Sequence, residues 1–296
     1  MTIFLTTNRY YIFIKKDEEI KFYFDSNTIV RIKRSETGEI DKIPLEEYIV
    51  GVISGEMPAS FELEALKAQA TAARTYVMKK IIDNKDKEYD VIDTTLNQVY
   101  LDTDSLKKRW QDKYNEYINK MKTAVKDTQG QYLTYKSEII DALYFSTSVG
   151  STENSEEVFV SALPYLRSVD SSWDAEVSPV FSENNDFSLQ EFYNRLGLKY
   201  SEKLDIEILE KTSTGRVKQI KINGVIFDSS SIVNKLNLRS NHFSIQKDGN
   251  ILSVTTKGYG HGVGMSQYGA QAMALKGYSY DEILKYYYQN VDIKIF

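Results

Sequence analysis

Residues 45–82 read LEEYIVGVISGEMPASFELEALKAQATAARTYVMKKII, and this stretch decides the fold. Its second half predicts a long helix that ends near Ile82, because apolar residues recur on one face at helical spacing. Pro58 is permitted in a first helical turn, and Ser60 is the expected cap. Small side chains let neighbouring elements approach closely, so we expect a central, buried helix that contains Ala65, Ala68, Ala70, Ala72 and Ala73.

Other elements follow on both sides of this helix. A short helix is expected over residues 46–53, and the apolar spacing from Leu106 to Val125 predicts another helix that stops at Gly130. Alternating segments predict strands. The remaining expected elements are strands near 10–14, 22–24, 30–32, 131–135, 139–145, 205–210, 217–222 and 243–246, a polar loop at 146–155, a linker at 178–185, and helices at 189–196, 265–276 and 280–288.

Together these elements predict an α+β fold. The alanine-rich helix packs with antiparallel strands around a substrate cleft, and a small α+β unit is inserted between two parts of the core. We divide the chain into an N-terminal β-rich segment (1–45), the first part of a catalytic core (46–170), the inserted unit (171–250), and the second part of the core with a glycine loop and C-terminal helices (251–296).

The composition is that of a soluble globular protein, with 296 residues, 42% hydrophobic and 27% charged. A net charge of -5 argues against nonspecific binding to nucleic acid, which requires a basic surface. The absence of cysteine excludes disulfides. No apolar run approaches the roughly 18 to 20 residues that span a bilayer. The 22 tyrosines suit a saccharide groove, but half-buried strands are also rich in tyrosine.

Glu56 is the first candidate for chemistry. Its sequence neighbours are mostly apolar or small, and burial among such groups raises the pKa of a carboxyl group, as a general acid requires. A nearby helix N-terminus would favour the anion instead, so the net direction of the shift stays open. A capping or solvent-facing glutamate is the structural alternative.

Two cations of the long helix, Lys67 and Arg74, are seven residues apart and therefore nearly aligned. They lie at one border of the apolar face, where they could hold a carboxylate or amide of a substrate. For Lys67, the residues alone favour a solvated charge beside Glu62 or Glu64.

A glycine-dense loop, GYGHGVG at 258–264, contains His261, whose imidazole could donate a hydrogen bond or move a proton. The glycines expose backbone amides but lack the setting of a nucleotide-binding fingerprint, and a tight turn is the alternative. The serine-rich loop at 146–155 offers hydroxyl groups. With only His242, His261 and no cysteine, a metal site is not expected.

Three segments resemble the stage II sporulation protein D family: 48–58, 64–76 and 258–270. Residues 142–159 are similar to the serine-rich loop of that family. The resemblance covers roughly 46–170 and 251–296, in the same order along the chain.

This resemblance implies a membrane-anchored lytic transglycosylase that trims peptidoglycan during engulfment in sporulating bacteria. Such proteins act on glycan strands from which a partner amidase has removed the stem peptides, and they stimulate that amidase. The implied location is the extracytoplasmic face of the mother-cell membrane, facing the engulfment septum. Contact with the membrane is expected only through an N-terminal anchor that this sequence does not contain.

The resemblance also assigns residues. The catalytic glutamate of the family falls on Glu56, and Lys67 and Arg74 match positions in its cleft helix. The remaining substrate-binding residues are expected to be Ser146, Ser148, Tyr259, His261 and Gln267.

Two departures from the family pattern stand out. Zinc-binding members carry cysteine and histidine around the segment that matches 91–100, but here the residues are VIDTTLNQVY, so no structural zinc and no cofactor are expected. The serine-rich loop reads FSTSVG at 145–150, without the paired glycines and the histidine often found there.

The expected mechanism uses one acid, Glu56, to cleave the bond between N-acetylmuramic acid and N-acetylglucosamine with a 1,6-anhydro product. Ordinary glycosidases use two carboxylates and consume water, and Asp170 or Asp174 could supply the second one. The alternative function is a noncatalytic peptidoglycan-binding protein that activates a cell-wall amidase.

Overall fold

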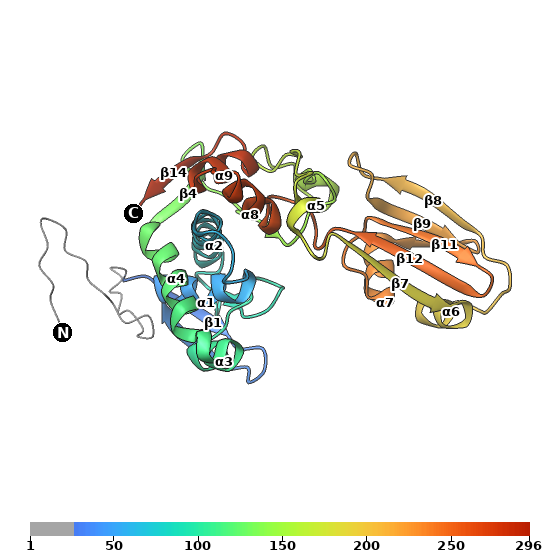
Figure 1. Ribbon diagram of the computed structural model, residues 1–296, viewed down its shortest axis with the longest axis horizontal. Helices are drawn as coiled ribbons and strands as arrows, with labels where there is room; N and C mark the ends of the chain where they lie inside the picture. The colour runs from blue at the N-terminus through green and yellow to red at the C-terminus, as the bar shows by residue number, and fades with distance from the viewer. Residues whose placement is uncertain (1–26) are drawn as a thin grey trace, which may run out of the picture.

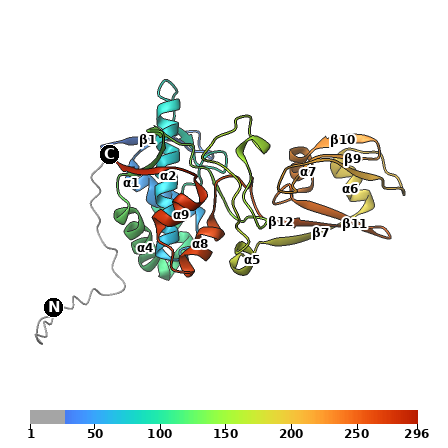
Figure 2. The same cartoon turned by 90° about the horizontal axis from the view of Figure 1, so that it is seen from above.

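The computed structural model describes residues 27–296, which form two lobes (Figure 1). The predicted strands at 10–14 and 22–24 lie outside the described residues. The first lobe carries most of the helices, and the second consists of small sheets with two helices. The chain passes between the lobes along β7 (Ser182–Ser188) and β12 (Ile251–Lys257), as the view from above also shows (Figure 2).

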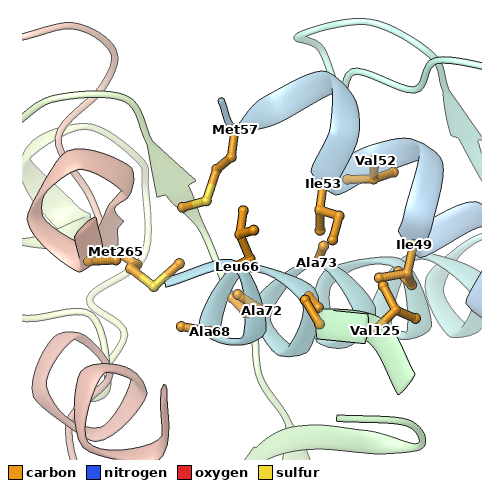
Figure 3. Packing of buried hydrophobic residues seen from close by; sticks show 14 of the residues in the cluster. Ile49, Val52, Ile53, Met57, Leu66, Ala68, Ala72, Ala73, Val125 and Met265 are labelled. Atoms are coloured by element: carbon orange, nitrogen blue, oxygen red, sulfur yellow. The ribbon is translucent and has the colours of Figure 1, made fainter. Parts of the chain in front are cut away.

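The centre of the first lobe is α2 (Leu63–Asp83). It contacts α1 (Leu45–Glu56), α4 (Tyr114–Asp127), β4 (Gln131–Tyr135), α8 (Gln267–Leu275) and α9 (Tyr280–Tyr287). Its five alanines are fully buried, and Ala68, Ala72 and Ala73 are seen beside Leu66 in the packed core (Figure 3). Close packing of this kind requires small side chains where several elements meet. The predicted α+β class and the central buried helix are both confirmed.

Three small sheets border this helical core. One has the order β2-β1-β3, another has the order β14-β4-β5, and a parallel pair joins β6 to β13. The parallel β6–β13 pair brings the segment before the serine-rich loop beside the segment after the glycine loop. Their bounds are β1 (Ile29–Lys33), β2 (Ile40–Pro44), β3 (Val91–Ile92), β5 (Glu138–Ile139), β6 (Tyr144–Phe145), β13 (Met265–Ser266) and β14 (Asp292–Ile295).

The second lobe has its own hydrophobic core, built from residues between Phe187 and Val254. It contains two antiparallel sheets, in the orders β10-β9-β8 and β11-β12-β7. The elements are α6 (Leu189–Leu196), β8 (Ile206–Lys211), β9 (Val217–Ile222), β10 (Val225–Asp228), α7 (Ser229–Leu236) and β11 (Phe243–Asp248).

Several details differ from the sequence predictions. The long helix begins at Leu63 with Glu62 as its N-cap residue, so Pro58 and Ser60 lie in the preceding turn. The predicted helix after Leu106 is broken at Gln111, whose φ of 47° is incompatible with a continuous right-handed helix. It forms α3 (Thr103–Trp110), a short 3₁₀ turn (Gln111–Lys113) and α4.

The predicted linker at 178–185 is also wrong in part, because residues from Ser182 onward form β7 and pair with β12. This strand is mostly exposed and polar, so its apolar alternation is weak. Before it, a 3₁₀ turn (Ser155–Glu157) and the short helix α5 (Asp174–Val177) interrupt an otherwise irregular segment.

Candidate active site

A cavity of ≈ 950 Å³ opens beside the carboxyl end of α1. This volume lies in the ordinary range of ligand sites. Glu56 and Gln267 lie on its wall, together with parts of α2, the loop at 95–97, β6, the segment at 159–163 and the glycine loop. The cleft therefore brings together three parts of the chain that are far apart in sequence.

Glu56 is the last residue of α1, and its carboxyl group is mostly buried. Its Oε1 accepts a hydrogen bond of 2.7 Å from the backbone N–H of Val99. Among residues 27–296, no cation forms a salt bridge with it. Burial raises the pKa of Glu56, and the Val99 N–H together with the nearby Gln267 and Tyr144 side chains offsets only part of that increase. The sequence left the direction of this pKa shift open, and the structure shows that it is upward. Glu56 lies at the C-terminus of a helix rather than at an N-terminus.

A buried chain of polar groups holds Tyr144 beside this acid. Gln98 Nε2 donates a hydrogen bond of 3.0 Å to the Tyr144 hydroxyl oxygen, and Tyr48 donates one of 2.9 Å to Gln98 Oε1. Because the Tyr144 oxygen already accepts from Gln98, its own hydrogen is free to point toward Glu56. Sequence analysis did not single out Tyr144 or Gln98, because Gln98 lies in a mostly polar segment and a tyrosine is ordinary in the apolar segment around Tyr144.

Gln267 lines the same cleft and is near enough to affect the pKa of Glu56. Its Nε2 is nevertheless buried and has no hydrogen bond of ordinary geometry with a described residue. A buried amide without a partner is costly unless a ligand or water satisfies it. Gln267 therefore offers a hydrogen-bond donor next to the acid.

Other predicted residues line the same cleft. Ser146 and Tyr259 both contribute to its wall, and Tyr259 is 47% exposed. The antiparallel bridge between Thr147 and Tyr259 holds the serine-rich and glycine loops together. At Gly264, with a φ of +83°, a Cβ atom would lie 2.0 Å from the Leu143 carbonyl oxygen, so this close approach requires glycine.

His261 also lines the cleft, but its ring is tied to the protein. Its Nδ1 accepts a hydrogen bond of 3.1 Å from the Val263 N–H, and the ring packs against Phe145 and Phe159. Burial and the nearby Arg216 lower the pKa of His261 to about 4. The imidazole is therefore neutral near pH 7 and does not supply a positive charge.

Lys67, Arg74 and Ser148 are not brought to the cleft. Arg74 is fully buried and binds the carboxylate of Glu46, while Lys67 Nζ lies 3.0 Å from both Glu64 and Asp127. Ser148 is buried and donates to the Ser171 carbonyl oxygen. These positions do not support direct contact of the three residues with a substrate in the cleft.

The two acids considered as a second carboxylate also lie elsewhere. Asp174 is buried and accepts hydrogen bonds from Ser171 and Ser266, and neither it nor Asp170 lines the cleft. The second carboxylate of the cleft is Asp141, which sequence analysis missed. No local pattern distinguishes this residue, which lies between β5 and β6 and reaches the cleft only in the folded chain.

Within residues 27–296 there is no group of three or more His, Cys, Asp or Glu side chains placed to hold a metal ion. No helix in the same range is long and apolar enough to cross a membrane.

Comparison with known proteins places the chain in a family. Residues 33–135 match the family described as Stage II sporulation protein. The chain is 43% identical to stage II sporulation protein D of Bacillus amyloliquefaciens over 91% of its own length and 79% of the relative. It is also 43% identical to the Bacillus subtilis (strain 168) protein of that name, over 89% and 78%. The chain belongs to the stage II sporulation protein D family, as its sequence motifs predicted.

A more distant relative carries a different name. The chain is 33% identical to a Bacillus subtilis (strain 168) protein named amidase enhancer, over 80% of this chain and 39% of that protein. The family thus links this chain to sporulation, and one relative is named for an effect on an amidase.

Proposed function

We propose that this protein is a lytic transglycosylase that cleaves the β-1,4 bond between N-acetylmuramic acid and N-acetylglucosamine in peptidoglycan strands without stem peptides. The observation that carries this proposal is Glu56, a mostly buried carboxyl group with a raised pKa and no cation partner among the described residues, on the wall of a large cleft. A carboxyl group whose pKa is raised by burial suits a general acid.

The reaction would begin with protonation of the glycosidic oxygen by Glu56. The bond between this oxygen and C1 of the muramic residue breaks. Glu56, now a carboxylate, removes the proton from the C6 hydroxyl of the same sugar, and O6 bonds to C1. The product is a 1,6-anhydro ring, the proton returns to Glu56, and no water is consumed.

Other cleft residues have roles that follow from their contacts. Tyr144 can donate a hydrogen bond to the Glu56 carboxylate after proton transfer, while Gln98 holds the tyrosine in place. Gln267 Nε2 and Ser146 offer hydrogen bonds to the sugar, and the exposed ring of Tyr259 offers a stacking surface. His261 would contribute the edge of a neutral ring.

The test compares the products that wild type and Glu56→Gln release from peptide-free glycan strands, read by mass spectrometry. We expect anhydro-ended fragments from wild type and a roughly 10²- to 10⁴-fold lower rate from the variant, the usual range for loss of a general acid. Glu47→Gln, on the exposed side of the same helix, is the matched control and should cleave normally. Wild-type turnover by Glu56→Gln would exclude the assignment of the acid.

Because Asp141 is a second carboxylate in the cleft, a hydrolytic mechanism must also be tested. If Asp141 acted as a base, water would enter the product, and ¹⁸O from labelled water would appear at the new reducing end. The transglycosylase mechanism predicts no incorporation in wild type or in Asp141→Asn.

A second function, stimulation of a cell-wall amidase, is favoured by the similarity to the protein named amidase enhancer. We expect this amidase to belong to the engulfment machinery and to remove the stem peptides from the strands that this protein cleaves. Both would act at the extracytoplasmic face of the mother-cell membrane. If purified Glu56→Gln raises amidase turnover as wild type does, the two functions are separable. If wild type cleaves no strands but still raises amidase turnover, the noncatalytic function replaces the transglycosylase.

A further inference from the structure

One positive charge lies on the wall of the cleft. Among the described residues 27–296 that line it, Lys80 of α2 is the single lysine or arginine, and His261 is neutral. The two cations expected from the sequence to bind substrate, Lys67 and Arg74, lie elsewhere and are held by carboxylates. An anionic group of a ligand in this cleft therefore has one cation to approach.

The Lys80 ammonium is only loosely held by the protein. Its Nζ lies 3.9 Å from Asp141 Oδ1, too far for a hydrogen bond, and 5.1 Å from the centre of the Tyr76 ring. The side chains of Lys80 and Asp141 are 26% and 30% exposed. By contrast, the neighbouring Lys79 binds Asp83 at 2.8 Å and does not line the cleft. Lys80 keeps hydrogen-bond donors that a ligand could use.

The position of Lys80 relative to the acid is set by α2. Tyr76 and Lys80 are four residues apart, so they occupy the same helix face about 6 Å apart along the axis. The charges of both Asp141 and Glu56 act on the Tyr76 hydroxyl, so this tyrosine lies near both carboxylates. A bound anion at Lys80 would thus lie in the same cleft as Glu56, one helical turn from Tyr76.

We propose that Lys80 binds the lactyl carboxylate of N-acetylmuramic acid and thereby selects glycan strands that have lost their stem peptides. This inference rests on the proposed function and names the residue that determines its substrate. A stem peptide converts the lactyl carboxylate into a neutral amide, so its removal creates the charge that Lys80 recognises. Asp141 pairs weakly with Lys80 in the free protein and competes with this carboxylate.

The test uses two forms of one substrate: peptide-free strands, and the same strands with their lactyl carboxylates coupled to methylamine. Binding is measured by calorimetry in a Glu56→Gln background, where strands stay intact. We expect about tenfold tighter binding of the carboxylate form, the range of one charged hydrogen bond at a partly exposed site. Lys80→Gln should abolish this preference, and Lys80→Arg should retain most of it.

Lys79→Gln is the matched control, because it removes the same charge one residue away and should leave the preference intact. Asp141→Asn should strengthen binding of the carboxylate form, since it removes the competing anion. An undiminished preference in Lys80→Gln, or an equal loss in Lys79→Gln, would overturn the inference. Strand cleavage is measured separately, with protein that retains Glu56. A lack of cleavage, which would contradict the proposed function, is therefore distinguishable from a lack of carboxylate preference, which would contradict the role of Lys80.

Discussion

Two carboxylates of α1, ten residues apart, show how differently one helix can use the same side chain. Glu46, near the start, is fully buried and binds Arg74 through both oxygens, at 2.9 Å to Nε and 2.6 Å to Nη2. Glu56, at the end, is mostly buried but has no cation within reach among the described residues. The charge of Glu46 is balanced by Arg74, whereas Glu56 has no such partner in the described part of the chain and its pKa is raised by burial.

The surroundings of Glu46 explain its role. Its Oε1 also accepts from the Gly130 N–H at 3.1 Å, and Arg74 donates to the Gln131 carbonyl oxygen at 3.1 Å. The pair therefore connects α1, α2 and the start of β4 at the centre of the first lobe. Glu46 with its cation therefore supports the structure, while Glu56, which has no cation partner within residues 27–296 and lines the cleft, is available for chemistry.

The largest effect is expected from breaking the first pair. Arg74→Met should lower the free energy of unfolding by about 3–5 kcal/mol, because it leaves the Glu46 charge buried and unpaired. Urea unfolding monitored by circular dichroism measures this loss. The double variant Glu46→Leu/Arg74→Met should recover much of it, since no lone charge remains. A fully stable Arg74→Met protein with weakened glycan binding would instead restore the role in substrate binding that the sequence suggested.

The second prediction concerns Glu56 and pH. Because its pKa is raised in the folded protein, protonation of Glu56 contributes stability below the ordinary carboxyl pKa of 4.5, and this contribution is lost as pH rises through the raised value. Each unit of increase corresponds to about 1.4 kcal/mol. Glu56→Gln should therefore be more stable than wild type at pH 7, with a smaller difference at pH 4.

The activity of wild type should follow the same titration. As the general acid loses its proton, kcat/KM should fall when pH rises through the raised pKa of Glu56. The measurement is a pH profile of strand cleavage beside pH-dependent unfolding of both proteins. A variant that is less stable than wild type at pH 7 would show that Glu56, like Glu46, supports the fold.

A smaller effect is expected from Tyr144→Phe, which removes the hydrogen bond to Glu56 but keeps the ring. Since that bond lowers the pKa of Glu56, the variant should shift the basic limb of the pH profile to higher pH. Turnover near neutral pH should change by about fivefold, as expected for one hydrogen bond. Tyr135→Phe, a tyrosine outside the cleft, serves as the control. An unchanged pH profile would remove Tyr144 from the site.

The contrast also shows what could be predicted from sequence. The α+β class, the central helix, the family and the position of Glu56 in a cleft all follow from local patterns and motifs. The sequence does not predict which charged side chains pair with each other, because Glu46 and Arg74 are 28 residues apart and Lys80 and Asp141 are 61 apart. Helix periodicity aligned Lys67 with Arg74 but said nothing of which neighbouring element would face them. Lys67, Arg74 and Lys80 all lie on α2, and only tertiary packing determines which of them reaches the cleft.

Lys67 provides the smallest effect and the last test of this comparison. Its ammonium bridges Glu64 of α2 and Asp127 of α4 near the surface, so it resembles Arg74 in being held by carboxylates but not in depth. Lys67→Gln should lower the free energy of unfolding by about 1 kcal/mol or less, because partly exposed ion pairs contribute little. The KM for peptide-free strands should stay unchanged, whereas Lys80→Gln raises it. A larger rise in KM for Lys67→Gln than for Lys80→Gln would mean that glycan binds near the α2–α4 surface instead of beside Glu56.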